Sequence, residues 1–266
     1  SLIVHELTTN EPIVDLRVFK VRSYAVGVFL MTIVGFVMYG SMVLLPIMLQ
    51  TLLGYPPMQA GIALAPRGLG SFLMMPLTGV LVGRVDARKL LATGLLVGGG
   101  TMLWLSTMNQ YAGYWDFFWP QVIQGMAMSM LFVPNTTIAM DAIPRERMGY
   151  ATSLFSLMRN MGGSIGIAAT STMLARRTQS TTVLYGANVT AMDPTSQSLF
   201  YQMRAAFMAG GADAVTATER AYAALFGMVM RQASIVSFVG LFQLLGIVFI
   251  IVTPLVLLMK IGRAHV

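Results

Sequence analysis

Two arginines lie deep inside otherwise apolar stretches of this sequence, where a permanent charge is unexpected. Arg67 comes seven residues after Ala60, the start of one stretch, and Arg159 comes nine residues after Tyr150. If these stretches cross a membrane, a guanidinium in lipid costs about 2.5 kcal/mol or more, so each must face protein or water. Arginine keeps its proton, and it therefore binds hydrogen-bond acceptors but cannot carry protons. We expect both to line a polar cavity or gate; the alternative is that each fixes its helix to backbone carbonyls of a neighbour.

Side-chain amides repeat along a third apolar stretch. Gln121, Gln124 and Asn135 fall on one face of a helix, with Met128 and Leu131 between them. A polar stripe on an apolar helix either hydrogen-bonds to another helix or lines a cavity. The predicted cavity-lining set is Arg67, Gln121, Gln124, Asn135, Arg159 and, from an earlier stretch, Tyr39.

Six long apolar runs must position these side chains. They span residues 24–49, 60–82, 90–108, 117–140, 150–174 and 233–259. Each is close to or above the ~20 residues that a helix needs to cross the hydrocarbon. The runs are continuous rather than alternating, which favours helices over a barrel. Hydrophobic residues make up 56% of the chain and charged residues 10%, against about 25% charged in soluble domains. The sequence predicts an all-α, polytopic protein with six transmembrane helices in the lipid bilayer.

The composition argues against several functions. The chain contains no cysteine, and its two histidines, His5 and His265, lie at opposite ends. We therefore expect no thiol catalysis, no metal site and no cofactor. No nucleophile–base pair is visible, which argues against an enzyme. The net charge of +7 does not indicate nucleic-acid binding, because the basic residues occupy short loops between apolar runs.

The basic loops predict an orientation. Loops on one side of the runs hold Arg17, Lys20, Arg22, Arg84, Arg88, Lys89, Arg145, Arg147, Lys260 and Arg263, whereas loops 50–59 and 109–116 hold none. The positive-inside rule then places both ends of the segment in the cytoplasm. Residues 1–22 become a cytoplasmic lead-in. Residues 175–232 become an extracytoplasmic loop with two amphipathic helical stretches, one around residues 199–207 and one that begins at a capping box at Thr216. This loop is expected to contact a partner or, as the alternative, to cover the exit of the cavity as a pair of surface helices. We expect residues 261–266 to be a non-native tail, and the start at Ser1 indicates a piece of a longer chain.

The loop between the second and third runs carries the sharpest motif. Its residues are Gly79, Gly83, Arg84, Asp86, Arg88 and Lys89. Glycines four apart permit close contact between helices. An acid among three basic residues can form a charge-assisted network that holds the loop against helix ends. An ordinary positive-inside loop is the alternative.

This motif resembles the signature loop that follows the second helix of each six-helix half in the major facilitator superfamily, although the usual Asp-Arg order is displaced here. Four more stretches resemble one subgroup, the EmrB/QacA-like fourteen-helix drug:proton antiporters. They are residues 12–19 (PIVDLRVF), 63–70 (ALAPRGLG), 144–149 (PRERMG) and 159–166 (RNMGGSIG). Their order and spacing against the six runs carry the resemblance, which covers residues 12–259.

The resemblance implies the C-terminal six-helix half of an alternating-access transporter in the bacterial inner membrane. Such a transporter exports hydrophobic or amphipathic, often cationic, compounds in exchange for protons. The implied partners are the missing N-terminal helices and a periplasmic adaptor protein at residues 175–232. No Asp or Glu lies at mid-membrane, so we expect the proton-coupling acid outside this chain. The alternatives left open are an exporter of a specific metabolite or lipid, and a non-transporting membrane binding or channel protein.

Overall fold

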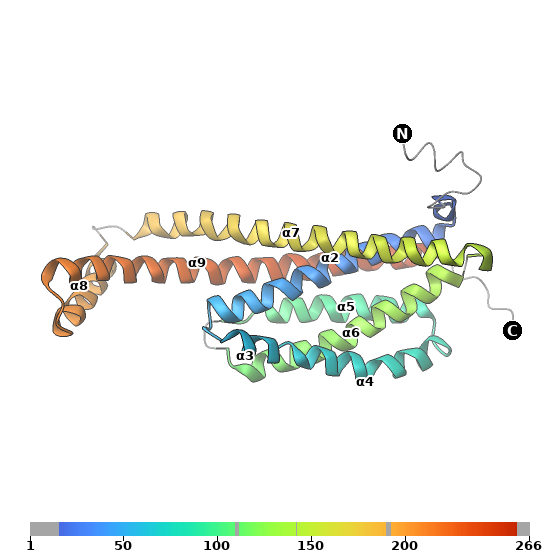
Figure 1. Cartoon of the computed structure of the whole chain (residues 1–266), viewed down its shortest axis with the longest axis horizontal. Coiled ribbons are helices and arrows are strands. Elements are labelled where there is room, and N and C mark those ends of the chain that lie inside the picture. Colours follow the sequence, from blue (N-terminus) through green and yellow to red (C-terminus); the bar gives the residue numbers. More distant parts are fainter. Residues whose placement is uncertain (1–15, 110–111, 142, 190–192, 260–266) are drawn as a thin grey trace. The chain divides into compact units, whose positions relative to one another are not determined.

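The computed structural model describes residues 16–109, 112–141, 143–189 and 193–259, which are helical almost throughout and contain no strand (Figure 1). The elements are η1 (Leu16–Lys20), α2 (Arg22–Thr51), α3 (Pro57–Ile62), α4 (Ala65–Val82), α5 (Ala87–Leu105), α6 (Tyr114–Asp141), η2 (Arg145–Arg147), α7 (Met148–Asn188), α8 (Pro194–Ala209), α9 (Ala214–Val252) and η3 (Thr253–Leu258). The expected tail at 261–266 and residues 1–15 of the expected lead-in lie outside the described residues.

The chain divides into two compact units. We call residues 16–171 together with 242–259 the bundle, and residues 172–241 the extension. The bundle holds α2 to α6, the first part of α7 and the last part of α9. The extension holds the remainder of α7, all of α8 and the first part of α9.

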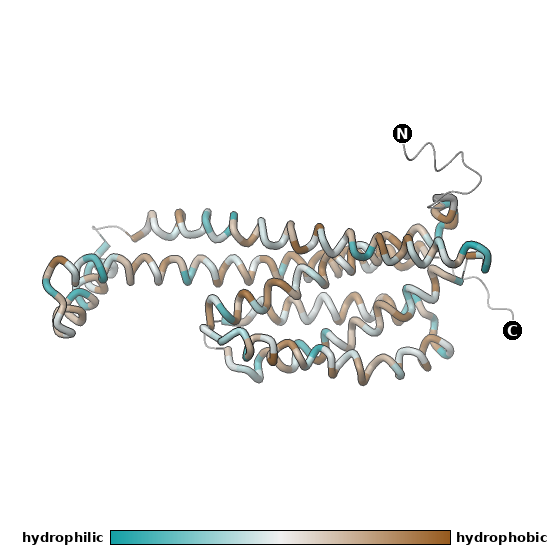
Figure 2. Tube along the Cα trace, viewed as in Figure 1, coloured by the Kyte–Doolittle hydropathy of each residue, from teal (hydrophilic) through white to brown (hydrophobic). Residues whose placement is uncertain are grey.

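Four helical stretches of the described chain are long and apolar enough to cross a membrane. They are Arg22–Thr51, Pro57–Val82, Tyr114–Asp141 and Ala214–Leu258, and they coincide with the first, second, fourth and sixth predicted runs. Helices α5 and α7 fall at the third and fifth runs. The start of α5 is basic and α7 carries many polar residues, so their crossing of the membrane stays a prediction. Figure 2 shows apolar residues along the bundle helices and more hydrophilic ones around η2 and α8. The expected all-α membrane fold is confirmed.

The second predicted run is not one unbroken helix. Helix α3 ends at Ile62, and α4 begins at Ala65 with Pro66 in its first turn. Proline has no backbone N–H to donate, so it fits the start of a helix and interrupts one elsewhere. In the sixth run, helix α9 ends at Val252, and the η3 turn that contains Pro254 follows directly.

Residues 175–232, expected as an extracytoplasmic loop with helical stretches, are helical for most of their length, and their location outside the cytoplasm stays a prediction. Helix α7 continues to Asn188 and α9 already begins at Ala214. Between residues 175 and 188 the sequence contains no proline and a single glycine, so nothing local stops α7. The predicted capping box at Thr216 is also displaced, because Asp213 accepts the backbone N–H groups of Val215 and Thr216 and so caps α9.

Helix α6 is the centre of the bundle, where it packs against α4, α5 and α2 (Figure 1). Large side chains from several helices are fully buried there, among them Tyr24, Leu95 and Phe117. The Tyr24 hydroxyl donates a hydrogen bond of 2.8 Å to the carbonyl of Ala151 and so links α2 to α7.

Helices α4 and α6 approach each other most closely, at small residues. A side chain at Gly125 would collide with the carbonyl of Arg67 and lie 2.9 Å from the backbone nitrogen of Ser71. Ser71 Oγ donates to the carbonyl of Gly125 at 2.9 Å, and Ser129 Oγ donates to the carbonyl of Ser71 at 3.1 Å. Hydroxyls thus bond across a contact that only glycine permits, as is typical of helix pairs in membranes.

We predict that Gly125→Ala destabilises the bundle. The added methyl group must push the α4 backbone away, which costs about 1–3 kcal/mol and outweighs the roughly 1 kcal/mol that alanine contributes to helix formation. The measurement is the thermal midpoint of the 266-residue chain in detergent, followed by size-exclusion chromatography. Gly100→Ala is the matched control, because nothing lies within 4 Å of a Cβ at Gly100. Equal midpoints for the two variants would contradict the prediction.

We also predict that α8 loosens in acid. The hydroxyl and then the backbone N–H of Ser196 donate to Asp193 and lower the pKa of its carboxyl group below the ordinary value of about 3.9. A lowered folded-state pKa means that this cap stabilises α8 above about pH 4 and is lost as the pH falls through the folded-state pKa. The protection factors of α8 amides, which correct the exchange rates for the pH dependence of intrinsic exchange, should therefore fall in strong acid. Asp193→Asn keeps an acceptor that does not titrate, and it should remove this pH dependence, whereas Glu219→Gln should leave it intact.

Candidate functional site

Arg67 is buried between α4 and α6, where two side-chain amides bind it. Its Nε donates to Gln121 Oε1 at 2.9 Å and its Nη2 donates to Gln124 Oε1 at 2.8 Å. The three side chains are 7%, 0% and 3% exposed, respectively. We call them the arginine–amide cluster. Sequence analysis predicted all three as cavity residues, and the structure brings them together.

The local sequence explains this geometry. Gln121 and Gln124 are three residues apart on α6, so both amides lie on one face of the helix. Gly125 follows directly and lets the α4 backbone approach at Arg67, which brings the guanidinium within reach of both amides. Gln124 Nε2 in turn lies 3.8 Å from Met102 Sδ on α5. The cluster therefore connects three helices.

Two donors of the cluster remain unpaired. Arg67 Nη1 and Gln121 Nε2 are buried and have no hydrogen-bond partner among the described residues. In the described chain, the hydrogen-bond partners of Arg67 are neutral amides, and no carboxylate pairs with it. Unpaired donors and an uncompensated positive charge favour a carbonyl, hydroxyl or anionic group at this place.

The small polar face that contains Arg67 does not line an open cavity. Gln59, Ala63, Arg67 and Ser71 share that face in sequence, and Ala63 and Arg67 are buried, with Arg67 and Ser71 bonded to α6. The opposite face of α4 is open instead: Phe72 is 76% exposed, and nothing lies within 4 Å of a Cβ at Gly68 or Gly79. The helix uses its polar side for packing inside the bundle.

Asn135 lies at a different helix contact. It is fully buried, and its Nδ2 donates to the carbonyl of Gly27 on α2 at 3.1 Å, while its Oδ1 has no partner among the described residues. Fourteen residues separate it from Gln121, which is about 20 Å along a helix. Asn135 therefore links α6 to α2 and does not belong to the arginine–amide cluster.

Arg159 and Tyr39 lie where α2 meets α7. A side chain at Gly35 would collide with the carbonyl of Arg159, and one at Gly163 would collide with the ring of Tyr39. The half-buried guanidinium of Arg159 has its Cζ 5.8 Å from the centre of the Phe132 ring, a cation–π contact. The predicted set thus occupies three helix contacts, and whether any member touches a transported compound stays a prediction.

The sequence of this helical chain matches a known family. Residues 5–167 fit the family described as Major Facilitator Superfamily. The chain belongs to the major facilitator superfamily. The family is one of multi-pass membrane transporters rather than of enzymes.

Individual relatives narrow the comparison. The chain is 34% identical to the Multidrug export protein EmrB of Escherichia coli over 203 residues, which cover 76% of the chain and 40% of the relative. It is 34% identical to the protein of the same name from Haemophilus influenzae over 205 residues, with the same two coverages of 76% and 40%. It is 36% identical to the Fatty acid resistance protein FarB of Neisseria gonorrhoeae over 176 residues, covering 66% of the chain and 34% of the relative. The chain therefore spans less than half the length of these relatives.

The loop that resembles the superfamily's signature motif has a simpler structure than its charges indicate. Asp86 Oδ1 accepts the backbone N–H of Arg88 at 2.9 Å and caps the start of α5. The structure shows this capping contact of the Asp86 carboxylate instead of the expected network with Arg84, Arg88 and Lys89. Gly79 and Gly83 contact no neighbouring helix within the described chain, so the close helix contact expected there does not form inside the bundle.

Sequence reasoning missed the glycines that set the helix spacing. Gly70, Gly125, Gly162 and Gly166 each face the backbone of a neighbouring helix. The small residues Gly125 and Ser129 are four apart on α6, as are Gly162 and Gly166 on α7, a spacing that indicates close helix contact. In a chain with 26 glycines, however, the same spacing also occurs where nothing packs, as at Gly79 and Gly83.

We predict that Arg67→Met destabilises the bundle by about 1–3 kcal/mol, because it leaves the oxygens of Gln121 and Gln124 buried without a donor. Replacing the two glutamines by leucine in the same protein should restore most of the loss, since the unpaired groups are then gone. The measurement is the thermal midpoint in detergent. Arg159→Met is the control and should shift the midpoint less, because its guanidinium contacts a ring and no amide. A triple variant as unstable as Arg67→Met alone would contradict the interpretation.

Proposed function

We propose that this chain is one half of a secondary active multidrug exporter, which moves hydrophobic and amphipathic compounds out of the cell in exchange for protons by alternating access. The observation that carries the proposal is the open face of α4. Small residues are enriched where membrane helices meet, and the face of α4 that carries Gly68 and Gly79 has no neighbouring helix in the described chain. A second helical domain, in the length of the relatives that this chain does not span, would cover it.

The two sides of α4 then have different functions. The arginine–amide cluster fixes α4 to α6, so that the bundle moves as one body when the two halves rock against each other. The exposed side, with Phe72 and Leu73 at 76% and 62% exposure, supplies an apolar wall toward the other half. Such a wall contacts compounds by shape and hydrophobicity, which suits a broad substrate range.

Proton coupling is assigned to the part of the protein beyond this chain. Inside the span Arg22–Thr51 and the span Pro57–Val82 there is no acidic residue, and in Tyr114–Asp141 the acids are Asp116 and Asp141, near the two ends. A coupling group must gain and lose a proton inside the membrane, which arginine does not do. The proposal places both ends of the described chain in the cytoplasm and an adaptor protein, if one is used, at the extension.

The names of the relatives support the substrate class. Two are multidrug export proteins and one is a fatty acid resistance protein. The last name favours a second candidate, an exporter of a specific lipid or other acidic amphiphile.

We predict that the full-length protein in proteoliposomes exports a lipophilic dye when a pH gradient is imposed, and that the 266-residue chain alone does not. In the full-length protein, Gly68→Leu should reduce export severalfold without lowering the thermal midpoint of the bundle, because it enlarges only the face of α4 toward the other half. Gly100→Leu is the control, since Gly100 also faces open space but lies on α5.

The outcomes separate the candidates. Absence of dye export by the full-length protein under a pH gradient would overturn the proposal, as would export by the isolated chain. A competition panel of lipophilic cations, neutral aromatics and fatty acids distinguishes a multidrug exporter, which all three inhibit, from a lipid exporter, which only fatty acids inhibit. Passive, non-saturable flux would indicate a channel.

A further inference from the structure

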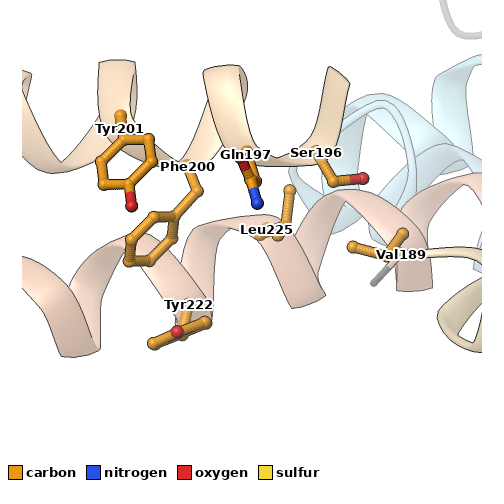
Figure 3. A pocket seen from close by; sticks show the side chains of 7 residues that line it. All are labelled: Val189, Ser196, Gln197, Phe200, Tyr201, Tyr222 and Leu225. Atoms are coloured by element: carbon orange, nitrogen blue, oxygen red, sulfur yellow. The ribbon is translucent and has the colours of Figure 1, made fainter. Parts of the chain in front are cut away.

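The extension contains a cavity that none of the bundle residues line. Its volume is about 160 Å³, and it lies between the end of α7, helix α8 and the first part of α9 (Figure 3). Three aromatic rings, of Phe200, Tyr201 and Tyr222, form much of its wall, and Val189 and Leu225 add aliphatic surface. We propose that this cavity is a binding site for a single uncharged aromatic ring that carries a hydrogen-bond donor.

The rings are arranged to hold another ring. Phe200 and Tyr222 have their centres 4.5 Å apart with 36° between their planes, and Phe200 meets Tyr201 edge-to-face at 5.6 Å. Tyr201 and Tyr222 are 59% and 61% exposed, so their ring surfaces are accessible to a ligand. Aromatic groups pack on one another in these offset and edge-to-face arrangements, which adds to the hydrophobic contribution of burial.

The volume limits the ligand to about one ring or a small fused pair. An apolar cavity of about 150 Å³ holds benzene, whereas pockets for drug-sized molecules begin at about 300 Å³. A larger amphiphile can place only one of its rings here.

The polar groups of the wall fit a neutral ligand that carries a hydrogen-bond donor. Among the residues that the structure describes, no charged side chain lines the cavity, and Ser196, Gln197 and the two tyrosines supply its polar groups. Ser196 donates its hydroxyl hydrogen to Asp193 at 2.6 Å, so its oxygen offers lone pairs to a ligand but no proton. Asp193 already accepts the hydroxyl and the N–H of Ser196 in capping α8, and it is therefore engaged. A phenol or an indole satisfies these conditions.

The test is ligand-observed saturation-transfer NMR with indole and the whole chain in lipid nanodiscs, with the signal of empty nanodiscs subtracted because indole partitions into lipid. Indole should bind saturably. Tyr222→Ala removes one ring, and it should weaken binding at least about fivefold. Leu225→Trp should abolish binding by filling the cavity while it leaves the Phe200–Tyr222 pair in place. Phe226→Ala is the matched control, because Phe226 is an exposed ring at the next position of α9 that does not line the cavity. Indole should bind this variant as tightly as it binds the unchanged chain.

Three results would overturn the inference. The first is indole binding that is equal in all variants, which would indicate lipid or another surface. The second is equal or tighter binding of benzoate or cyclohexanol, which would remove the requirement for an uncharged or an aromatic ligand. The third is no binding of indole together with binding of a peptide that presents an aromatic side chain, which would make the cavity a protein-docking site. This test does not depend on transport, so it can fail while the proposed function stands.

Discussion

The contact between α4 and α6 is the constraint on which the rest of the bundle depends. Lipid offers no hydrogen bonds, so a guanidinium on a membrane helix must find its partners inside the protein. Arg67 finds them in two amides one turn apart on α6, at 2.9 and 2.8 Å. The amides reach it only because Gly125 brings the two backbones together. The guanidinium of Arg67, the two amides and Gly125 therefore act together to hold α4 against α6, and none of them does so alone.

The other helix contacts follow the same physical rule in weaker form. Asn135 bonds to a backbone carbonyl of α2, and Tyr24 bonds to a carbonyl of α7. At each contact a small residue removes bulk, and a polar side chain bonds across the gap. These polar side chains of the bundle consequently serve to join its helices, and the exposed face of α4 is apolar.

The extension has a separate basis for its stability. It carries the aspartates that cap α8 and α9, Asp193 and Asp213, and both caps are exposed to water. It contains aromatic contacts of Phe200 with Tyr201 and Tyr222 and also fully buried small residues, among them Ala217 and Ala221. Rings that pack at the surface leave gaps between them, and the cavity beside Phe200 is such a gap. The bundle is therefore held by close helix contacts at glycines, and the extension by aspartate caps and aromatic contacts.

The sequence by itself determined the helical membrane fold and the positions of the six apolar runs, because hydrophobic length is a local feature. It also marked Arg67, Gln121 and Gln124 as polar groups inside apolar runs, but it did not pair them. It did not determine where helices end without a breaker, as at α7, or which of many glycine pairs face a neighbour. Nor did it determine that the polar face of α4 turns into the bundle, since a polar stripe fits a cavity and a helix contact equally well. Only tertiary packing decides such questions, because they depend on which backbone lies opposite a given residue. That opposing backbone comes from residues far apart in the chain.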